Sequence, residues 1–219
     1  MASWTRKPYI TYGLIVINVI VFLLMTLLGG SENVSTLIAF GAKVNTLILE
    51  GQWWRFITPM FLHIGFEHIL LNMITLYFIG TQIEAFFGSG RFLALYLLSG
   101  IGGNIASFTF NPTALSAGAS TALFGLFGAF LMLGESFREN PYIRAMSRQF
   151  LLLVILNVIF GFSGNVDLAG HLGGLATGFL AAYVVGVPMI GKVPLMKRLV
   201  SLLAIIFVGG LLLIMGFKI

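Results

Sequence analysis

The sequence predicts an all-α bundle of membrane-spanning helices, and three observations support this fold class. First, 58% of the 219 residues are hydrophobic and only 9% are charged, with a mean hydropathy of +1.03, a balance that is not typical of soluble domains. Second, the apolar stretches are long enough to cross a bilayer. Third, they lack strand-like alternation, which leaves helices as the spanning elements because lipid cannot satisfy backbone polar groups. We expect a single membrane domain over residues 1–219.

Seven stretches are predicted to span the membrane, at about 9–29, 67–83, 92–110, 117–134, 149–163, 168–187 and 199–217. The first is long and no small-residue cleavage site follows it, so we expect a retained helix rather than a signal peptide. The fourth is rich in small residues, the fifth is marginal in length, and the sixth begins just after Asp167. The seventh is predicted to be a C-terminal addition to a core of six helices over about 9–187.

Basic residues are divided unevenly between the two sets of loops, and this division predicts the orientation. One set contains Arg6, Lys7, Arg91, Arg138, Arg144, Arg148, Lys192, Lys197 and Arg198, and the other contains Lys43, Arg55 and Lys218. Cytoplasmic loops carry the excess of lysine and arginine, so we expect the N-terminus inside and the C-terminus outside. The net charge of +5 is then a property of the loops, and we expect no nucleic-acid partner.

Three short polar segments interrupt the apolar spans. They are HIGFEHILLN with His63, His68 and Asn72, GAST with Ser120, and AGHLGGLATG with His171. Polar groups inside hydrocarbon are costly and are read as functional by default. The second, fourth and sixth spans all enter from outside in the predicted topology, so the three segments converge in the outer third of the bundle. Each residue taken singly could still be satisfied within its own helix.

Small residues predict that the fourth and sixth spans touch. Gly170, Gly174 and Gly178 recur at every fourth position, and the fourth span is thinned by Gly118, Ala122, Gly125 and Gly128. Such spacing lets helix backbones approach closely in lipid. Close approach would bring the Ser120 hydroxyl within hydrogen-bond reach of the His171 imidazole, which is the geometry of a nucleophile and its base. The chain has no cysteine, which excludes thiolate metal sites, and we expect neither a metal nor a cofactor.

The order of these motifs resembles that of the rhomboid intramembrane serine proteases over nearly the whole chain. The matching features are Trp54-Arg55, His63, His68 with Asn72, Glu84 with Gly88-Ser89-Gly90, Gly118-x-Ser120, and His171-x-x-Gly174-x-x-x-Gly178. The seventh span is similar to the extra C-terminal helix of some members. The resemblance to bacterial members implies an integral protein of the bacterial inner membrane with its active site near the extracytoplasmic face.

The resemblance also implies a role for each residue of the site. Ser120 would be the nucleophile and His171 its base, in a dyad without a carboxylate. His68 and Asn72 would stabilise the oxyanion together with the Ser120 amide, although Asn72 could instead make an interhelical hydrogen bond. Gly118 would leave room for the substrate backbone, and Phe124 would stack on the catalytic histidine where many members have tyrosine.

Several nearby residues are expected to be structural. His63 would hold the first outer loop in place, Glu84 would make a structural bond or cap, and Arg55 would pair with a carboxylate or with loop carbonyls. Asp167 is expected to have a loop or helix-cap role and to lie toward water, above the histidine ring, rather than to join a triad. The segment 162–166 is short and contains a glycine, so it is a candidate lid.

Thr121 replaces the smaller residue that most members have after the serine, and it could narrow the substrate groove. Trp53, Trp54 and Arg55 are typical of an anchor at the membrane interface.

These features predict a serine endopeptidase that cleaves transmembrane helices of membrane proteins near their outer ends. Its partners would be transmembrane substrates and the lipid bilayer, and the oligomeric state is open. An inert relative that binds transmembrane helices is a second possibility, but such proteins usually lose the serine or the histidine, and this chain has both. A small transporter is a third, but the inner halves of the spans offer almost no polar lining and no inverted repeat is evident.

Overall fold

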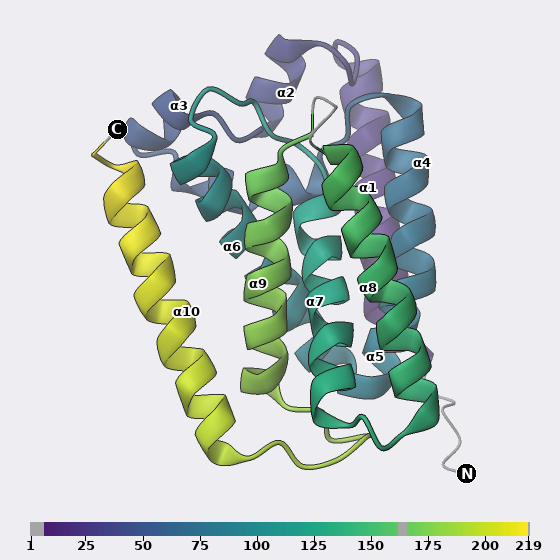
Figure 1. Cartoon of the computed structure of the whole chain (residues 1–219). Helices are drawn as coiled ribbons and strands as arrows, with labels where there is room; N and C mark the ends of the chain where they lie inside the picture. Colours follow the sequence, from purple (N-terminus) through teal and green to yellow (C-terminus); the bar gives the residue numbers. More distant parts are fainter. Residues whose placement is uncertain (1–6, 162–165, 219) are drawn as a thin grey trace.

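A computed structural model describes residues 7–161 and 166–218 of the chain (Figure 1). In chain order the elements are α1 (Tyr9–Leu27), α2 (Val34–Phe40), α3 (Asn45–Leu49), the 3-10 turns η1 (Trp53–Phe56) and η2 (Thr58–Phe61), α4 (Gly65–Thr75), the π turn η3 (Leu76–Gly80), α5 (Thr81–Phe87), α6 (Ser89–Phe110), α7 (Ser120–Ser136), α8 (Pro141–Gly161), α9 (Leu168–Val185) and α10 (Leu195–Gly216). The described residues form no strand, only an isolated bridge between Lys43 and Ser116.

The prediction of an all-α membrane bundle is confirmed. Six helical segments within the described residues are long and apolar enough to cross a membrane, counting α4, η3 and α5 as one. α7 is a seventh apolar helix but is shorter, with 17 residues. The protein is therefore an integral membrane protein, and the seven predicted spans correspond to helices.

The predicted fifth span was wrong at its beginning. It was placed at 149–163, whereas α8 begins at Pro141, where the Asn140 side chain accepts hydrogen bonds from Tyr142 and Ile143 backbone amides at 3.0 and 3.3 Å. Hydropathy places the beginning of this span after Arg148 because the first two turns of α8 contain Arg144 and Arg148. The helix includes these turns because the Asn140 side chain caps its first amides and because long basic side chains can extend to the membrane surface.

α7 lies in the middle of the bundle, with α6, α8 and α9 around it (Figure 1). Every residue from Thr121 to Phe130 is buried. The first long loop, with α2, α3, η1 and η2, lies at the end of the bundle where α4, α7 and α9 begin, which we call the loop end. The N-terminus of α1 and the end of α5 lie at the opposite end.

Backbone contact between α7 and α9 confirms the prediction made from the small residues. A methyl group at Gly174 would overlap the Thr121 carbonyl oxygen, and one at Gly178 would overlap the Gly125 carbonyl oxygen. In the other direction, a methyl group at Gly128 would overlap the Leu175 carbonyl oxygen. Glycine is thus needed on both helices for the observed approach.

Glu84 joins the start of α1 to the end of α5. Its carboxylate accepts hydrogen bonds from the Ile10 and Thr11 backbone amides at 3.1 and 2.8 Å, and from the Thr11 and Ser89 hydroxyls at 2.7 and 2.6 Å. The first amides of a helix have no partner within the helix, and a carboxylate there is also favoured by the helix dipole. Glu84 is therefore a cap for α1, far from the site described below.

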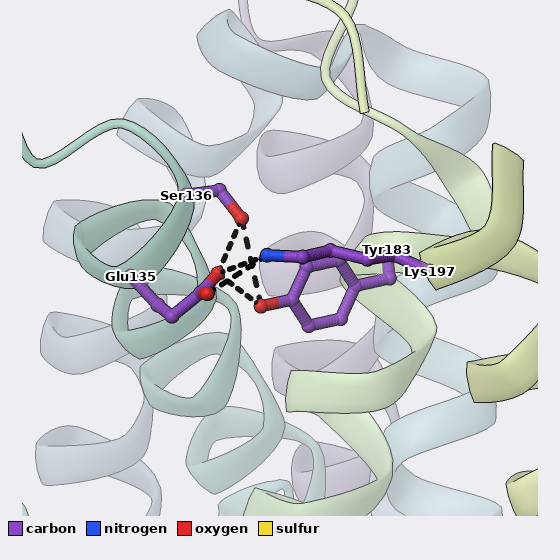
Figure 2. A network of polar contacts seen from close by, with 4 residues as sticks. All are labelled: Glu135, Ser136, Tyr183 and Lys197. Carbon is purple, nitrogen blue, oxygen red and sulfur yellow. Dashed lines mark hydrogen bonds and ion pairs between the residues drawn. The ribbon is translucent and has the colours of Figure 1, made fainter. Parts of the chain in front are cut away.

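A polar network fastens α10 at the end opposite the loop end (Figure 2). Lys197 of α10 donates to both carboxylate oxygens of Glu135 at 2.8 and 3.0 Å, and the Tyr183 hydroxyl of α9 donates to the same carboxylate. Ser136 contributes a further hydroxyl at 2.7 Å. At the loop end Phe217 packs on Phe108 of α6, with ring centroids 5.3 Å apart. α10, which corresponds to the predicted seventh span, is thus attached to the bundle at both of its ends.

The first long loop is fixed to the chain that leads into α7. Arg55 donates to the Ala42 carbonyl at 2.7 Å, so its partner is a loop carbonyl. Lys43 is fully buried and donates to the Asn111 and Ala114 carbonyls at 2.7 and 3.2 Å. Burial lowers the pKa of Lys43 to about 8, against an opposing effect of the Asp167 carboxylate. These bonds hold the segment just before Ser120 in place.

Candidate active site

Ser120 is the first residue of α7, and the turn before it requires glycine at position 118. Gly118 has φ +140°, a conformation that L side chains rarely adopt, and its amide donates to the Pro59 carbonyl at 2.8 Å. A Cβ atom there would lie 2.8 Å from Cε1 and 2.9 Å from Nε2 of His68. Gly118 therefore keeps open the space between Ser120 and His68.

The Ser120 hydroxyl and the His171 imidazole are brought together by the contact of α7 with α9. Ser120 Oγ lies 2.8 Å from His171 Nε2. The Phe124 ring, one turn below Ser120, stacks on the imidazole with centroids 4.1 Å apart and planes 17° apart, as predicted. Serine thus has a hydrogen-bonded base, and the base is held by an aromatic face.

Asp167 caps α9 and does not contact the His171 ring. It accepts from the Gly170 amide at 3.1 Å and from the hydroxyls of Ser107 and Ser116. The predicted cap is confirmed, and the half-buried Asp167 side chain also lines the cavity described below. Burial alone would raise the pKa of Asp167, and the hydrogen bonds outweigh it and lower the pKa. Among the described residues no carboxylate hydrogen-bonds to His171.

His68 and Asn72 lie on α4 and face the same cavity as Ser120 and His171. The Ile64 amide donates to His68 Nδ1 at 3.3 Å, so a neutral ring carries its proton on Nε2, the nitrogen next to Gly118. Asn72 Nδ2 donates to the His68 carbonyl at 2.8 Å, which leaves its second N–H available. Ser120, at the first position of α7, has a backbone amide with no acceptor inside the helix.

His63 lies behind the site rather than only within the first loop. It is fully buried, its ring is 5.1 Å from the His68 ring, and the Ala119 amide approaches its Nε2 at 3.5 Å. Burial, with a smaller contribution from His68, lowers the pKa of His63 to about 3. His63 is therefore a neutral acceptor that supports both the turn before Ser120 and the His68 ring. Nothing in its local sequence pointed to the contact with Ala119.

Two further predictions concern the surroundings of the dyad. The Thr121 side chain fits between α6 and α9, where a methyl group on Gly170 would lie 3.2 Å from its Cγ2, and it also lines the cavity. The candidate lid at 162–166 falls mostly on residues 162–165, which are outside the described residues.

The cavity has a volume of about 1000 Å³ and extends from the dyad down between α4, η3 and α5 on one side and α8 on the other. Its lining includes four amides that the sequence analysis did not single out, Gln82, Asn104, Gln149 and Asn157. The available signal was their position inside the second, third and fifth apolar spans. Within the described residues no cluster of three or more His, Asp or Glu side chains could hold a metal ion.

Comparison with known proteins identifies the family. Residues 50–188 match the Rhomboid domain model. The chain is 46% identical over 201 residues to Rhomboid protease GluP of Bacillus subtilis, an alignment that covers 91% of this chain and 39% of GluP. It is 40% identical over 163 residues to RHOMBOID-like protein 5 of Arabidopsis thaliana, covering 72% of this chain and 52% of the relative.

A shorter relative is matched over most of its own length. The chain is 37% identical over 142 residues to the Putative rhomboid protease YdcA of Bacillus subtilis, covering 64% of this chain and 71% of YdcA. By contrast, the chain spans only about two fifths of the length of GluP. The family model and these identities together lead to one conclusion: the chain belongs to the rhomboid family.

Proposed function

We propose that the chain is an intramembrane serine endopeptidase that cleaves transmembrane helices near their outer ends. The observation that carries this proposal is the 2.8 Å separation of Ser120 Oγ and His171 Nε2 inside a cavity that continues along the bundle. The names of the relatives GluP and YdcA, both given as rhomboid proteases, support the same activity.

In the proposed mechanism Ser120 Oγ attacks the scissile carbonyl carbon while His171 Nε2 takes the hydroxyl proton. The tetrahedral oxyanion accepts hydrogen bonds from His68 Nε2–H, the Asn72 amide and the Ser120 backbone N–H. The imidazolium then gives its proton to the leaving amine. Water next attacks the acyl-enzyme with His171 again as base, which releases the acid product and restores the serine.

The Phe124 ring provides part of the orientation and charge stabilisation that the third residue of a triad provides. A carboxylate in a triad orients the imidazole and stabilises its charge. Here Phe124 holds the plane of the His171 ring by stacking, and an aromatic face also attracts a cation. The dyad can therefore remain aligned without a carboxylate on Nδ1.

The proposal includes an orientation and a location. The division of basic residues, nine against three, supports an N-terminus in the cytoplasm and a loop end outside. The similarity to a Bacillus protein favours a bacterial cell membrane. The dyad would then lie near the extracytoplasmic face, where water reaches the serine.

His68→Ala is expected to lower kcat by about 10²- to 10³-fold with little change in KM, because the lost hydrogen bond is made mainly to the oxyanion of the transition state. Steady-state kinetics with a model transmembrane substrate in detergent would measure both constants. A change confined to KM would contradict the role assigned to His68.

The test of the function is reconstitution of the purified chain in liposomes with a model transmembrane substrate that has a Gly/Ala segment near its outer end. We expect cleavage within that segment, mapped by mass spectrometry, and covalent labelling of Ser120 by a fluorophosphonate. A leucine-only span should be cut more slowly because exposing its backbone requires unwinding a stable helix. Absence of both cleavage and labelling would favour an inert relative that binds transmembrane helices.

A further inference from the structure

Two glutamine side chains line the part of the cavity that lies away from the dyad. Gln82, in the first turn of α5, is on one side, and Gln149 of α8 is on the other. The neighbouring lining is apolar and includes Phe78, Phe127 and Leu153. α8 and the α4–α5 segment line opposite sides of this cavity, so the two amides face the groove between these helices.

Ring contacts give the depth of these amides below the nucleophile. The Phe150 ring stacks on Phe130 with centroids 4.1 Å apart, and the Phe86 ring is 6.2 Å from Phe130. Phe130 follows Ser120 by ten residues in α7, about 15 Å along the helix axis. Gln149 adjoins Phe150, and Gln82 lies one turn nearer the loop end than Phe86. Both amides are therefore about 10–15 Å, or two to three helical turns, below Ser120.

The hydrogen-bonding capacity of the two amides is incomplete within the described residues. Gln82 donates to the Phe78 carbonyl at 2.8 Å, but its Oε1 is buried and has no partner there. The exposed Gln149 side chain has no hydrogen bond to any other described residue. Acyl chains offer no donor or acceptor, so an unpaired amide at this depth is costly and calls for a polar partner.

We propose that Gln82 and Gln149 form a subsite for a hydrogen-bonding side chain of the substrate helix, such as Asn, Gln, Ser or Thr, seven to ten residues after the scissile bond. This proposal rests on the proposed function. The substrate helix is the occupant because the groove is continuous with the cavity at Ser120 and His171. If the scissile bond of a substrate helix lies at Ser120 and the helix continues along this groove, the residues seven to ten positions after that bond lie at the level of the two amides.

Asn157 provides a matched control on the same helix. It is also an amide of α8 that lines the cavity, and its Nδ2 donates to the Leu153 carbonyl at 2.8 Å. It lies eight residues from Gln149, about 12 Å nearer the loop end. Asn157→Leu therefore removes an amide from the groove without removing one from the subsite.

The experiment measures kcat/KM in liposomes for a set of transmembrane substrates. Each has the Gly/Ala segment at the cleavage site and a single Asn at one of the positions six to eleven residues after the scissile bond, and the parent has Leu at all of these positions. The wild type is expected to prefer Asn over Leu by about three- to tenfold at one position between seven and ten, the range found for interhelical hydrogen bonds in membranes. Gln149→Met and Gln82→Met, which keep side-chain length, should each reduce this preference, and the double variant should bring it close to one.

The preference is the ratio of kcat/KM for two substrates of the same variant. A variant that is only partly folded lowers both values equally and leaves the ratio unchanged. Asn157→Leu should keep the ratio. An unchanged ratio in the double variant, or no preference at any position from seven to ten, would overturn the subsite while leaving the protease function intact. Failure of the wild type to cleave even the Gly/Ala parent would instead overturn the proposed function.

Discussion

His171→Ala is expected to lower the rate of cleavage by at least about 10³-fold. The imidazole is the only base within hydrogen-bond reach of Ser120 Oγ among the described residues, at 2.8 Å, and removal of a base from such an arrangement leaves only the contribution of the oxyanion donors and substrate binding. Ser120→Ala should have an effect of the same size, and the double variant should be no worse than either single one because the two groups act as a unit.

The measurement is initial rate in liposomes, combined with fluorophosphonate labelling of Ser120 in His171→Ala. Labelling should fall with cleavage because the unassisted hydroxyl is a weak nucleophile. Phe124→Tyr is the matched control, since it keeps the aromatic stack on the imidazole and should stay within about threefold of the wild type. Wild-type rates in His171→Ala would refute the dyad.

Gly178→Leu is expected to abolish both the native fold and the activity. Any Cβ at this position overlaps the Gly125 carbonyl oxygen, carbonyl carbon and Cα. Added methylenes in a packed core cost about 1–3 kcal/mol when side chains can shift, and here the obstacle is the backbone of α7. α7 and α9 would have to separate, which would also separate Ser120 from His171.

Gly210→Leu in α10 is the control for this variant. No heavy atom lies within 4 Å of the position that its Cβ would take, so stability and activity should both be retained. Thermal unfolding in detergent and the cleavage assay measure the two effects for each variant. Normal unfolding and activity in Gly178→Leu would show that the α7–α9 contact does not hold the dyad together.

The sequence predicted the fold because its strongest signals are local. Apolar length identified each span, and glycine at every fourth position identified the contact between α7 and α9, which requires only the helical repeat. The first turns of α8 were missed because Arg144 and Arg148 interrupt the hydropathy although the helix continues through them.

The site was predictable to the extent that its residues stand out from an apolar background. Ser120, His68 and His171 are such residues, and the predicted convergence follows from the direction of each span. The partners of Asp167 could not be predicted, because Ser107 of α6 and Ser116 of the following loop are more than fifty residues away in the sequence. Serine is also common in both loops and helices, so neither residue stood out. The same is true of the contact between His63 and Ala119, which depends on how the first loop folds over the bundle.

The burial of α7 affects how the protein can adapt to bilayers of different thickness. A helix in contact with acyl chains has to match the thickness of the hydrocarbon layer, and mismatch is relieved by tilting or by deforming the bilayer. α7, surrounded by protein along Thr121 to Phe130, does not have to meet this requirement, and its 17 residues make it about one turn shorter than α6, with 22, and α8, with 21. The helix that begins with Ser120 can therefore be short without exposing a short helix to lipid, and adaptation to thin or thick membranes depends on the peripheral helices.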